Sequence, residues 1–72
     1  MKTAKVTTKI YKRDYTLLID GNEVGNWSTL ADACRVAFRG CGIEKVESDI
    51  GNVVKAGSMM VMETTRYCIG SL

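Results

Sequence analysis

Basic side chains recur at an even spacing near the start of the chain, and they are the residues best suited to bind an anionic partner. Lys5, Lys9 and Arg13 share one face of an extended segment, with Tyr11 among them. Side chains on one face of a strand lie about 6.6 Å apart, so these cations recur at roughly twice that distance. Such a stripe can track nucleic acid phosphates while a tyrosine stacks on a base. It can equally meet an acidic protein surface, or protect an edge strand from pairing with other chains.

The charge of the chain is unevenly distributed. The 72 residues carry a net charge of only +2. Residues 1–13 hold five cations and no acid, so the remaining residues carry a net charge of −3. Two further cations, Arg35 and Arg39, lie off the apolar stripe of a predicted helix, where they can add phosphate contacts. The candidate binding residues are therefore Lys5, Lys9, Tyr11, Arg13, Arg35 and Arg39.

Most residue patterns that carry catalysis are absent from this chain. It has no His, which removes the commonest general base, and no glycine-rich phosphate loop. Its three cysteines, Cys34, Cys41 and Cys68, form no Cys-x-x-Cys pair, whereas a structural zinc site needs four closely spaced ligands. We expect a protein that is not an enzyme and that uses no cofactor or metal. Three cysteines cannot all pair within one chain, and free thiols suit a reducing cytoplasm.

The first part of the chain predicts three antiparallel strands. Residues 4–12 alternate apolar and polar side chains, as a half-buried strand does. Residues 15–19 form a more apolar strand, and the Asp20-Gly21 pair that follows is a strong signal for a tight hairpin turn. A short third strand from residue 23 to residue 27 completes a β-meander.

A helix is predicted directly after this meander. Thr29 and Asp32 fit a capping box at its first turn, and Gly40 and Gly42 are expected to end the helix. In the third strand, Gly25 suggests either a bulge or a close approach of another backbone. Trp27 either covers one end of the core or, if exposed, anchors an interface. A one-sided apolar stripe predicts which helix face is buried, and it comprises Leu30, Ala33, Cys34, Ala37 and Phe38.

Residues 43–57 fit more than one structure. Their apolar spacing allows a helix, and Ser48 as a cap favours a short helix from residue 49 to residue 56. Residues 49–52 could equally form a turn that joins two strands, because Gly51 is poor helix material.

These patterns together predict one α+β domain over residues 1–72. Apolar residues from Met59 to Tyr67 or Ile69 indicate a final strand. The expected architecture is an antiparallel sheet of about four strands, in which the β-meander precedes the helix and the final strand follows it. The helix is expected to pack on one face of the sheet, and a second short helix is expected if residues 49–56 are helical.

Residues 15–33 resemble a unit of small phage and mobile-element proteins. Their strand, Asp-Gly hairpin, short strand, Ser-Thr cap and helix are similar to the DNA-binding modules of tyrosine integrases and AP2-type domains. They also look like small phage inhibitors, including several anti-CRISPR proteins. The DNA-binding modules read bases with polar and basic sheet residues, whereas the second strand here offers Leu17, Leu18 and Ile19. The resemblance to the inhibitors therefore implies a protein that docks on a bacterial complex.

The expected function is that of a phage-type, anti-CRISPR-like inhibitor that docks on a bacterial protein or ribonucleoprotein complex and blocks it sterically. The alternative is a small nucleic-acid-binding protein that uses the basic first strand. A third hypothesis is an oligomer-forming module such as a homodimer, because a domain this small often needs extra support. No stretch is apolar enough for a membrane helix or a secretory signal. We therefore expect no membrane contact and a cytoplasmic location, in the host cell if a phage encodes the protein.

Overall fold

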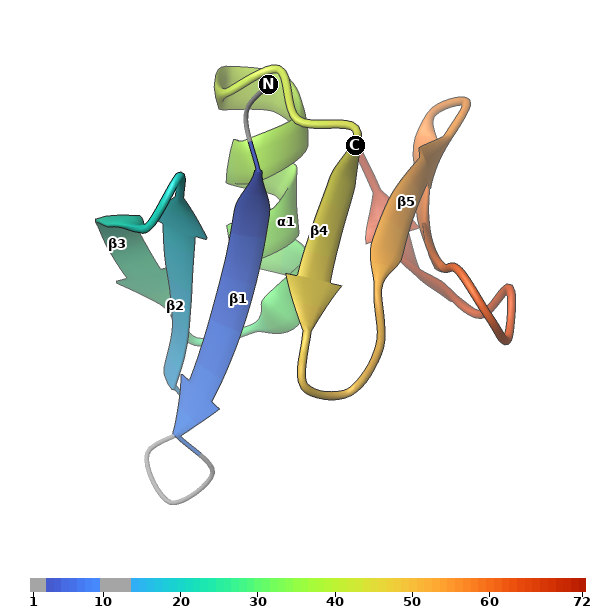
Figure 1. The fold of residues 1–72 in the computed structure, drawn as a ribbon. Helices are drawn as coiled ribbons and strands as arrows, with labels where there is room; N and C mark the ends of the chain where they lie inside the picture. The colour runs from blue at the N-terminus through green and yellow to red at the C-terminus, as the bar shows by residue number, and fades with distance from the viewer. Residues whose placement is uncertain (1–2, 10–13) are drawn as a thin grey trace.

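One mixed β-sheet makes up most of the protein, whose computed structural model describes residues 3–9 and 14–72. In these residues the sheet has seven strands in the order β3-β2-β1-β4-β5-β6-β7 (Figure 1). Neighbouring strands are antiparallel except β1 and β4, which run parallel. The strands are β1 (Ala4–Lys9), β2 (Asp14–Ile19), β3 (Asn22–Trp27), β4 (Lys45–Ser48), β5 (Val53–Ala56), β6 (Met59–Met62) and β7 (Cys68–Ser71).

Strands β1 to β3 form the predicted meander. Ala4 and Val6 are buried while Lys5 between them is exposed, so the described part of the first strand alternates as expected. Asp20 and Gly21 turn the chain from β2 into β3 with φ angles of 52° and 82°. These positive angles give a tight turn whose twist matches that of the two strands it joins.

The bulge predicted in the third strand is present. Leu17 of β2 lies opposite Gly25, whereas its neighbour Leu18 lies opposite Glu23. The register therefore shifts by one residue, and Val24 has no partner on β2. Because β3 is an edge strand, this irregularity also makes it a poorer template for pairing with another chain.

The helix begins at the predicted cap. Thr29 accepts a hydrogen bond at its hydroxyl from the Asp32 backbone N–H, at 3.1 Å, and so satisfies a free donor of the first turn. The α-helical part, α1 (Leu30–Arg35), continues into a π-helical segment, η2 (Val36–Gly40). That wider turn closes where the backbone N–H groups of Cys41 and Ile43 both donate to the carbonyl of Ala37.

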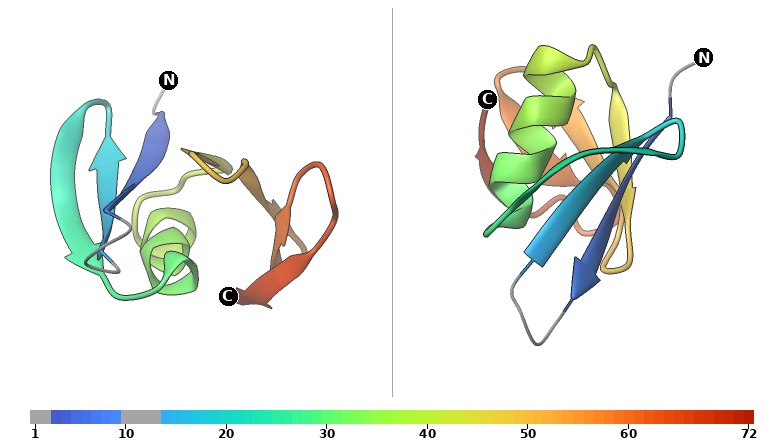
Figure 2. Two further views of the ribbon diagram at one scale, coloured as in Figure 1. Left: turned by 90° about the horizontal axis from the view of Figure 1, so that it is seen from below. Right: turned by 90° about the vertical axis from the view of Figure 1, so that its left-hand side faces the viewer.

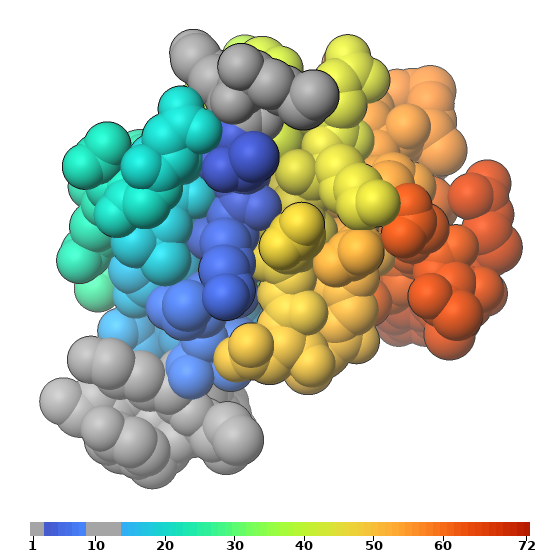
Figure 3. Space-filling model, viewed as in Figure 1, coloured from blue at the N-terminus to red at the C-terminus, as the bar shows by residue number. Residues whose placement is uncertain are grey.

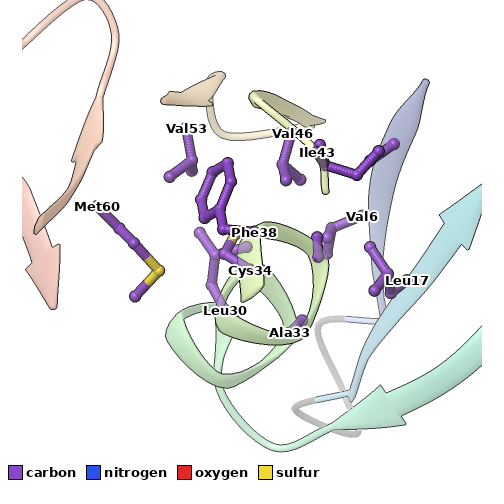
Figure 4. Packing of buried hydrophobic residues seen from close by; sticks show 12 residues of the cluster. Val6, Leu17, Leu30, Ala33, Cys34, Phe38, Ile43, Val46, Val53 and Met60 are labelled. Carbon is purple, nitrogen blue, oxygen red and sulfur yellow. The ribbon is translucent and has the colours of Figure 1, made fainter. Parts of the chain in front are cut away.

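The sheet curves around this helix. Figure 2 (left) shows β1, β2 and β3 on one flank of the helix and β5, β6 and β7 on the other, so the helix lies on the concave side. Figure 4 shows Phe38 directed from the helix toward Val46 and Val53. Every buried side chain of the described residues except Val61 belongs to one cluster, which comprises Ala4, Val6, Leu17, Leu30, Ala33, Cys34, Ala37, Phe38, Ile43, Val46, Val53 and Met60.

The predicted fold class is wrong, because the sheet is neither four-stranded nor fully antiparallel. The first reason lies in residues 43–57, where β4, a turn and β5 replace the favoured helix. The Ser48 hydroxyl donates to the Gly51 carbonyl, and Gly51 has a φ of 133°. A Cβ at Gly51 would lie 2.7 Å from the Met62 methyl group, so the turn presses closely on β6. Val46 and Val53, which fit helical spacing, instead face each other across β4 and β5.

The second reason is that the predicted final strand is two strands. The chain reverses after Met62, where Arg66 adopts a positive φ of 61° and donates its N–H to the Met62 carbonyl at 2.9 Å. The Met62 N–H in turn donates to the Tyr67 carbonyl at 2.7 Å, which starts the pairing of β6 with β7. Among the described residues, no helix combines the length and the apolarity needed to traverse a bilayer.

Candidate functional site

The predicted basic stripe is only partly within the described residues. Lys5 is exposed and projects from the convex face of the sheet, since its neighbours in β1 point inward. Lys9 is the last residue of β1, opposite Asp14 in the backbone register. Tyr11 and Arg13 lie outside the described residues. The structure therefore places one of the four side chains of the stripe on a defined surface.

Acidic residues accompany the cations on this part of the sheet. Lys5 lies opposite Glu47 in the parallel register of β1 and β4. On β4, the Lys45 ammonium forms an ion pair with Glu63 at 3.2 Å. Such neighbours weaken the attraction of this surface for a polyanion, because each carboxylate offsets one cation.

Arg35 links the helix to the far edge of the sheet. Its Nη1 lies 2.8 Å from Asp32 Oδ1, and its Nε donates to the Ser71 carbonyl at 2.9 Å. Ser71 belongs to the edge strand β7, so the guanidinium provides a hydrogen-bond donor for a backbone carbonyl of that edge strand. Its Nη2 also lies over Gly70, 3.2 Å from the position a Cβ would take. Arg35 therefore has a positioning role in the fold, whatever else it binds.

Arg39 lies one turn further along and is exposed. Neither ion pair found in the described residues involves it. Its charge is therefore not offset by a direct contact within that part of the chain, and it can attract a carboxylate or phosphate of a partner.

Trp27 lies beside these arginines at the end of β3. Its side chain is half-buried, packs against the core, and covers Gly25, where an added Cβ would meet the indole at 3.1 Å. Covering a glycine in this way fills the gap that a missing side chain leaves on an edge strand. The indole therefore covers β3 at Gly25 and also borders a hollow that residues of the helix line.

Together these residues line a surface hollow of about 400 Å³, which we call the tryptophan–arginine pocket. Its walls carry two guanidinium groups and one carboxylate, and that carboxylate is already paired with Arg35. The remaining positive charge and the apolar walls suit a partner group that is apolar and carries an anion. The lining residues are Trp27, Asp32, Arg35, Val36 and Arg39.

Two of the predicted binding residues line the pocket, and the described part of the basic stripe lies elsewhere on the protein. Arg35 and Arg39 share the pocket because they lie four residues apart on the helix. Lys5 is remote from both, since it projects from the convex face whereas the helix lies on the concave side (Figure 2). The sequence predicted that Trp27 would cover one end of the core or, if exposed, anchor an interface, but no pattern in it indicated that Trp27 would share a pocket with the arginines.

A larger hollow of about 470 Å³ lies where β1 approaches β4, two strands that lie side by side on the face shown in Figure 3. Among the described residues, its charged lining residues are Glu44, Lys45 and Glu47, and none of the predicted binding residues lines it. Since the described lining also holds more acidic than basic residues and no aromatic side chain, this hollow is the weaker candidate for a macromolecular interface.

The three cysteines do not form a metal-binding site in the described residues. They are free, and no group of three or more His, Cys, Asp and Glu side chains there could hold a metal ion. Burial raises the pKa of the Cys34 thiol from 9.0 to about 12, so it is a protonated core residue at neutral pH.

Comparison of the chain with protein-family models, with curated proteins and with solved structures finds no match. The tryptophan–arginine pocket, through its geometry and the chemistry of its residues, is therefore the feature of the protein that bears on function.

Proposed function

We propose that the protein is a non-enzymatic docking protein that binds a bacterial protein or nucleoprotein complex and blocks it sterically, as phage inhibitors of the anti-CRISPR type do. The observation that carries this proposal is the tryptophan–arginine pocket, in which Trp27 of β3 and the exposed Arg39 of η2 lie around one hollow. Trp and Arg are the residues most enriched among those that dominate binding energy at protein interfaces.

The chemistry of the pocket favours a protein partner over nucleic acid. One uncompensated cation beside an indole and Val36 suits a single carboxylate next to an apolar side chain. Nucleic acid binding draws instead on several phosphate contacts along a positive track. On the described convex face, Lys5 has Glu47 beside it and Lys45 is already ion-paired. The basic first strand remains the site of the alternative, nucleic-acid-binding hypothesis.

The compartment we propose is the cytoplasm, in the bacterial host if the protein comes from a phage. Cys34, Cys41 and Cys68 are all free, and the exposed Cys68 would be open to oxidation outside a reducing compartment. A small inhibitor acting on a bacterial complex would meet its target there.

A quantitative pull-down from bacterial lysate tests the proposal. The tagged protein should retain one partner in stoichiometric amount, and Arg39→Glu should reduce that retention about tenfold because it opposes the partner's carboxylate with a like charge. Lys55→Glu is the matched control, since Lys55 is exposed on β5 and outside the pocket. Equal losses for Arg39→Glu and Lys55→Glu, or no stoichiometric partner, would contradict the proposal.

Two further measurements distinguish a protein partner from a nucleic acid partner. Lys5→Glu combined with Lys9→Glu reverses charge on the first strand, and the docking proposal predicts that retention is unchanged. Affinity for a single carboxylate should also fall only gently with added salt, whereas binding to several phosphates falls steeply. Loss of binding on reversing Lys5 and Lys9, together with steep salt dependence, would favour the nucleic-acid-binding alternative.

A further inference from the structure

Two loops at neighbouring positions of the sheet carry the most exposed large hydrophobic side chains of the described residues. Tyr67 in the β6–β7 loop is 68% exposed, and Ile50 in the β4–β5 turn is 64% exposed. Figure 1 shows both connections toward the lower side of the view. Neither residue belongs to the tryptophan–arginine pocket, so the proposed docking function does not account for them.

Hydrogen bonds connect the two loops, and one ion pair links the second of them to β4. The Glu63 backbone N–H donates to the Asn52 carbonyl at 2.8 Å, and the Asn52 side-chain amide donates to Glu63 Oε1 at 3.4 Å. The other carboxylate oxygen, Oε2, lies 3.2 Å from the Lys45 ammonium on β4. Because the loops are held in place before any contact forms, a partner that binds both loses less conformational entropy on binding.

Each loop is also closed within itself. In the first, the Gly51 N–H donates to the Ser48 carbonyl at 3.1 Å. In the second, the Arg66 N–H donates to the Met62 carbonyl at 2.9 Å, while Arg66 holds a positive φ of 61°. A long side chain seldom adopts that conformation, and strained positions of this kind cluster at sites of function. The second loop therefore presents Arg66 and Tyr67 in a defined direction.

The charges around the two apolar side chains are of opposite sign. Asp49 precedes Ile50, and Arg66 precedes Tyr67, and both charged residues are exposed. Neither of them takes part in an ion pair with another described residue. In a two-fold interface, residue i of one copy contacts residue j of the other and j contacts i, so one acid and one base on the same surface can form two equivalent ion pairs. We call the four residues Asp49, Ile50, Arg66 and Tyr67 the loop patch.

We propose that the loop patch binds the loop patch of a second copy of this chain and forms a two-fold symmetric homodimer. In the dimer, Asp49 of each copy faces Arg66 of the other, and Ile50 and Tyr67 pack between the two ion pairs. A domain of 72 residues buries a smaller share of its surface than a larger one and gains from such support. The patch is small, so the dimer forms reversibly and dissociates on dilution.

Sedimentation velocity across a wide range of protein concentration tests the dimer. Asp49→Arg alone and Arg66→Asp alone each place like charges opposite one another, and each should weaken the dimer about tenfold. The double variant exchanges acid and base on both copies, which recreates both ion pairs, and should restore most of the affinity. Asp tolerates a positive φ, so Arg66→Asp retains the loop conformation.

Two more variants complete the test. Ile50→Ser combined with Tyr67→Ser removes the apolar contact and should leave a monomer at every concentration. Val24→Ser is the control, since Val24 is a 48% exposed hydrophobic residue on β3, outside the loop patch, and its loss should leave the dimer intact. A wild-type monomer throughout, or a double charge reversal no tighter than either single variant, would overturn the proposal. Arg39→Glu leaves the dimer intact, so this result is independent of the docking proposal.

Discussion

Ala4 and Val46 lie opposite each other in β1 and β4, the one parallel pair of strands in the described part of the sheet. Both side chains are buried, with exposed fractions of 3% and 0%. Their pairing joins the N-terminal meander to the strands that follow the helix, and so makes one sheet of two segments that are distant in sequence. The helix crosses between them on the concave side, where it forms the tryptophan–arginine pocket.

Shortening Val46 should test how much this junction contributes to stability. Val46→Ala is expected to lower the free energy of unfolding by about 2 kcal/mol, since it removes buried methyl groups and leaves a cavity. Urea denaturation measures the change. Val24→Ala is the matched control, because Val24 is half-exposed, and should cost less than about 0.5 kcal/mol. Equal effects of the two variants would contradict the assigned packing.

Removing the Arg35 side chain should loosen the edge strand β7. Arg35→Ala abolishes the hydrogen bond to the Ser71 carbonyl and the ion pair to Asp32, and should cost about 1 kcal/mol. Hydrogen exchange of the β7 amides should become faster, while exchange in the meander stays unchanged. Arg39→Ala, on the same helix, is the control and should leave β7 exchange as it is. Unchanged β7 exchange in Arg35→Ala would count against the proposed link between helix and edge.

The protein should become less stable in acid, in part because Glu63 becomes protonated. Hydrogen bonds from Lys45 and Asn52, and the charge of Lys45, lower the pKa of the Glu63 carboxyl below its ordinary value of 4.5. A lowered folded-state pKa means that the unfolded chain takes up a proton first. The stability that the ionised Glu63 contributes is therefore fully present above pH 4.5 and is lost as the pH falls through the folded-state pKa.

The measurement for Glu63 is a series of urea midpoints from neutral pH into acid. Glu63→Gln keeps the shape of the side chain but cannot titrate, so its midpoints should fall less steeply in acid than those of the wild type. Other carboxylates titrate alike in both proteins and cancel from the comparison. Parallel curves for the two proteins would show that the ion pair with Lys45 adds no pH dependence.

The cysteines should differ in reactivity toward a thiol-alkylating reagent. Cys68 is exposed and should react in the native state, whereas Cys34 is buried with a pKa of about 12 and should react only after unfolding. Because the unfolded thiol ionises near 9.0, Cys34 also makes the fold less stable as the pH rises above that value. Mass spectrometry after timed labelling measures both sites. Rapid native labelling of Cys34 would contradict its place in the core.

Local sequence patterns predicted the elements whose structure depends on neighbours along the chain. The alternation around Lys5 predicted the described part of β1, the Asp20-Gly21 pair predicted the hairpin, and Thr29 marked the helix start. Each of these depends on local backbone preferences or on a period of two or about four residues. The positions of Lys5 and of Arg39 on the exterior were predictable for the same reason.

The second half of the fold and the composition of the pocket depend instead on contacts between segments that are distant in sequence. Short apolar segments such as those around Val46 and Val53 suit a helix or a buried strand equally, and the choice depends on the partner that covers them. The parallel partner of β4 is β1. These strands are far apart in sequence, so no local pattern predicts that they pair. Likewise, Trp27 and Arg39 line one pocket although they belong to different elements, β3 and η2, and the relative position of these elements depends on packing of the core.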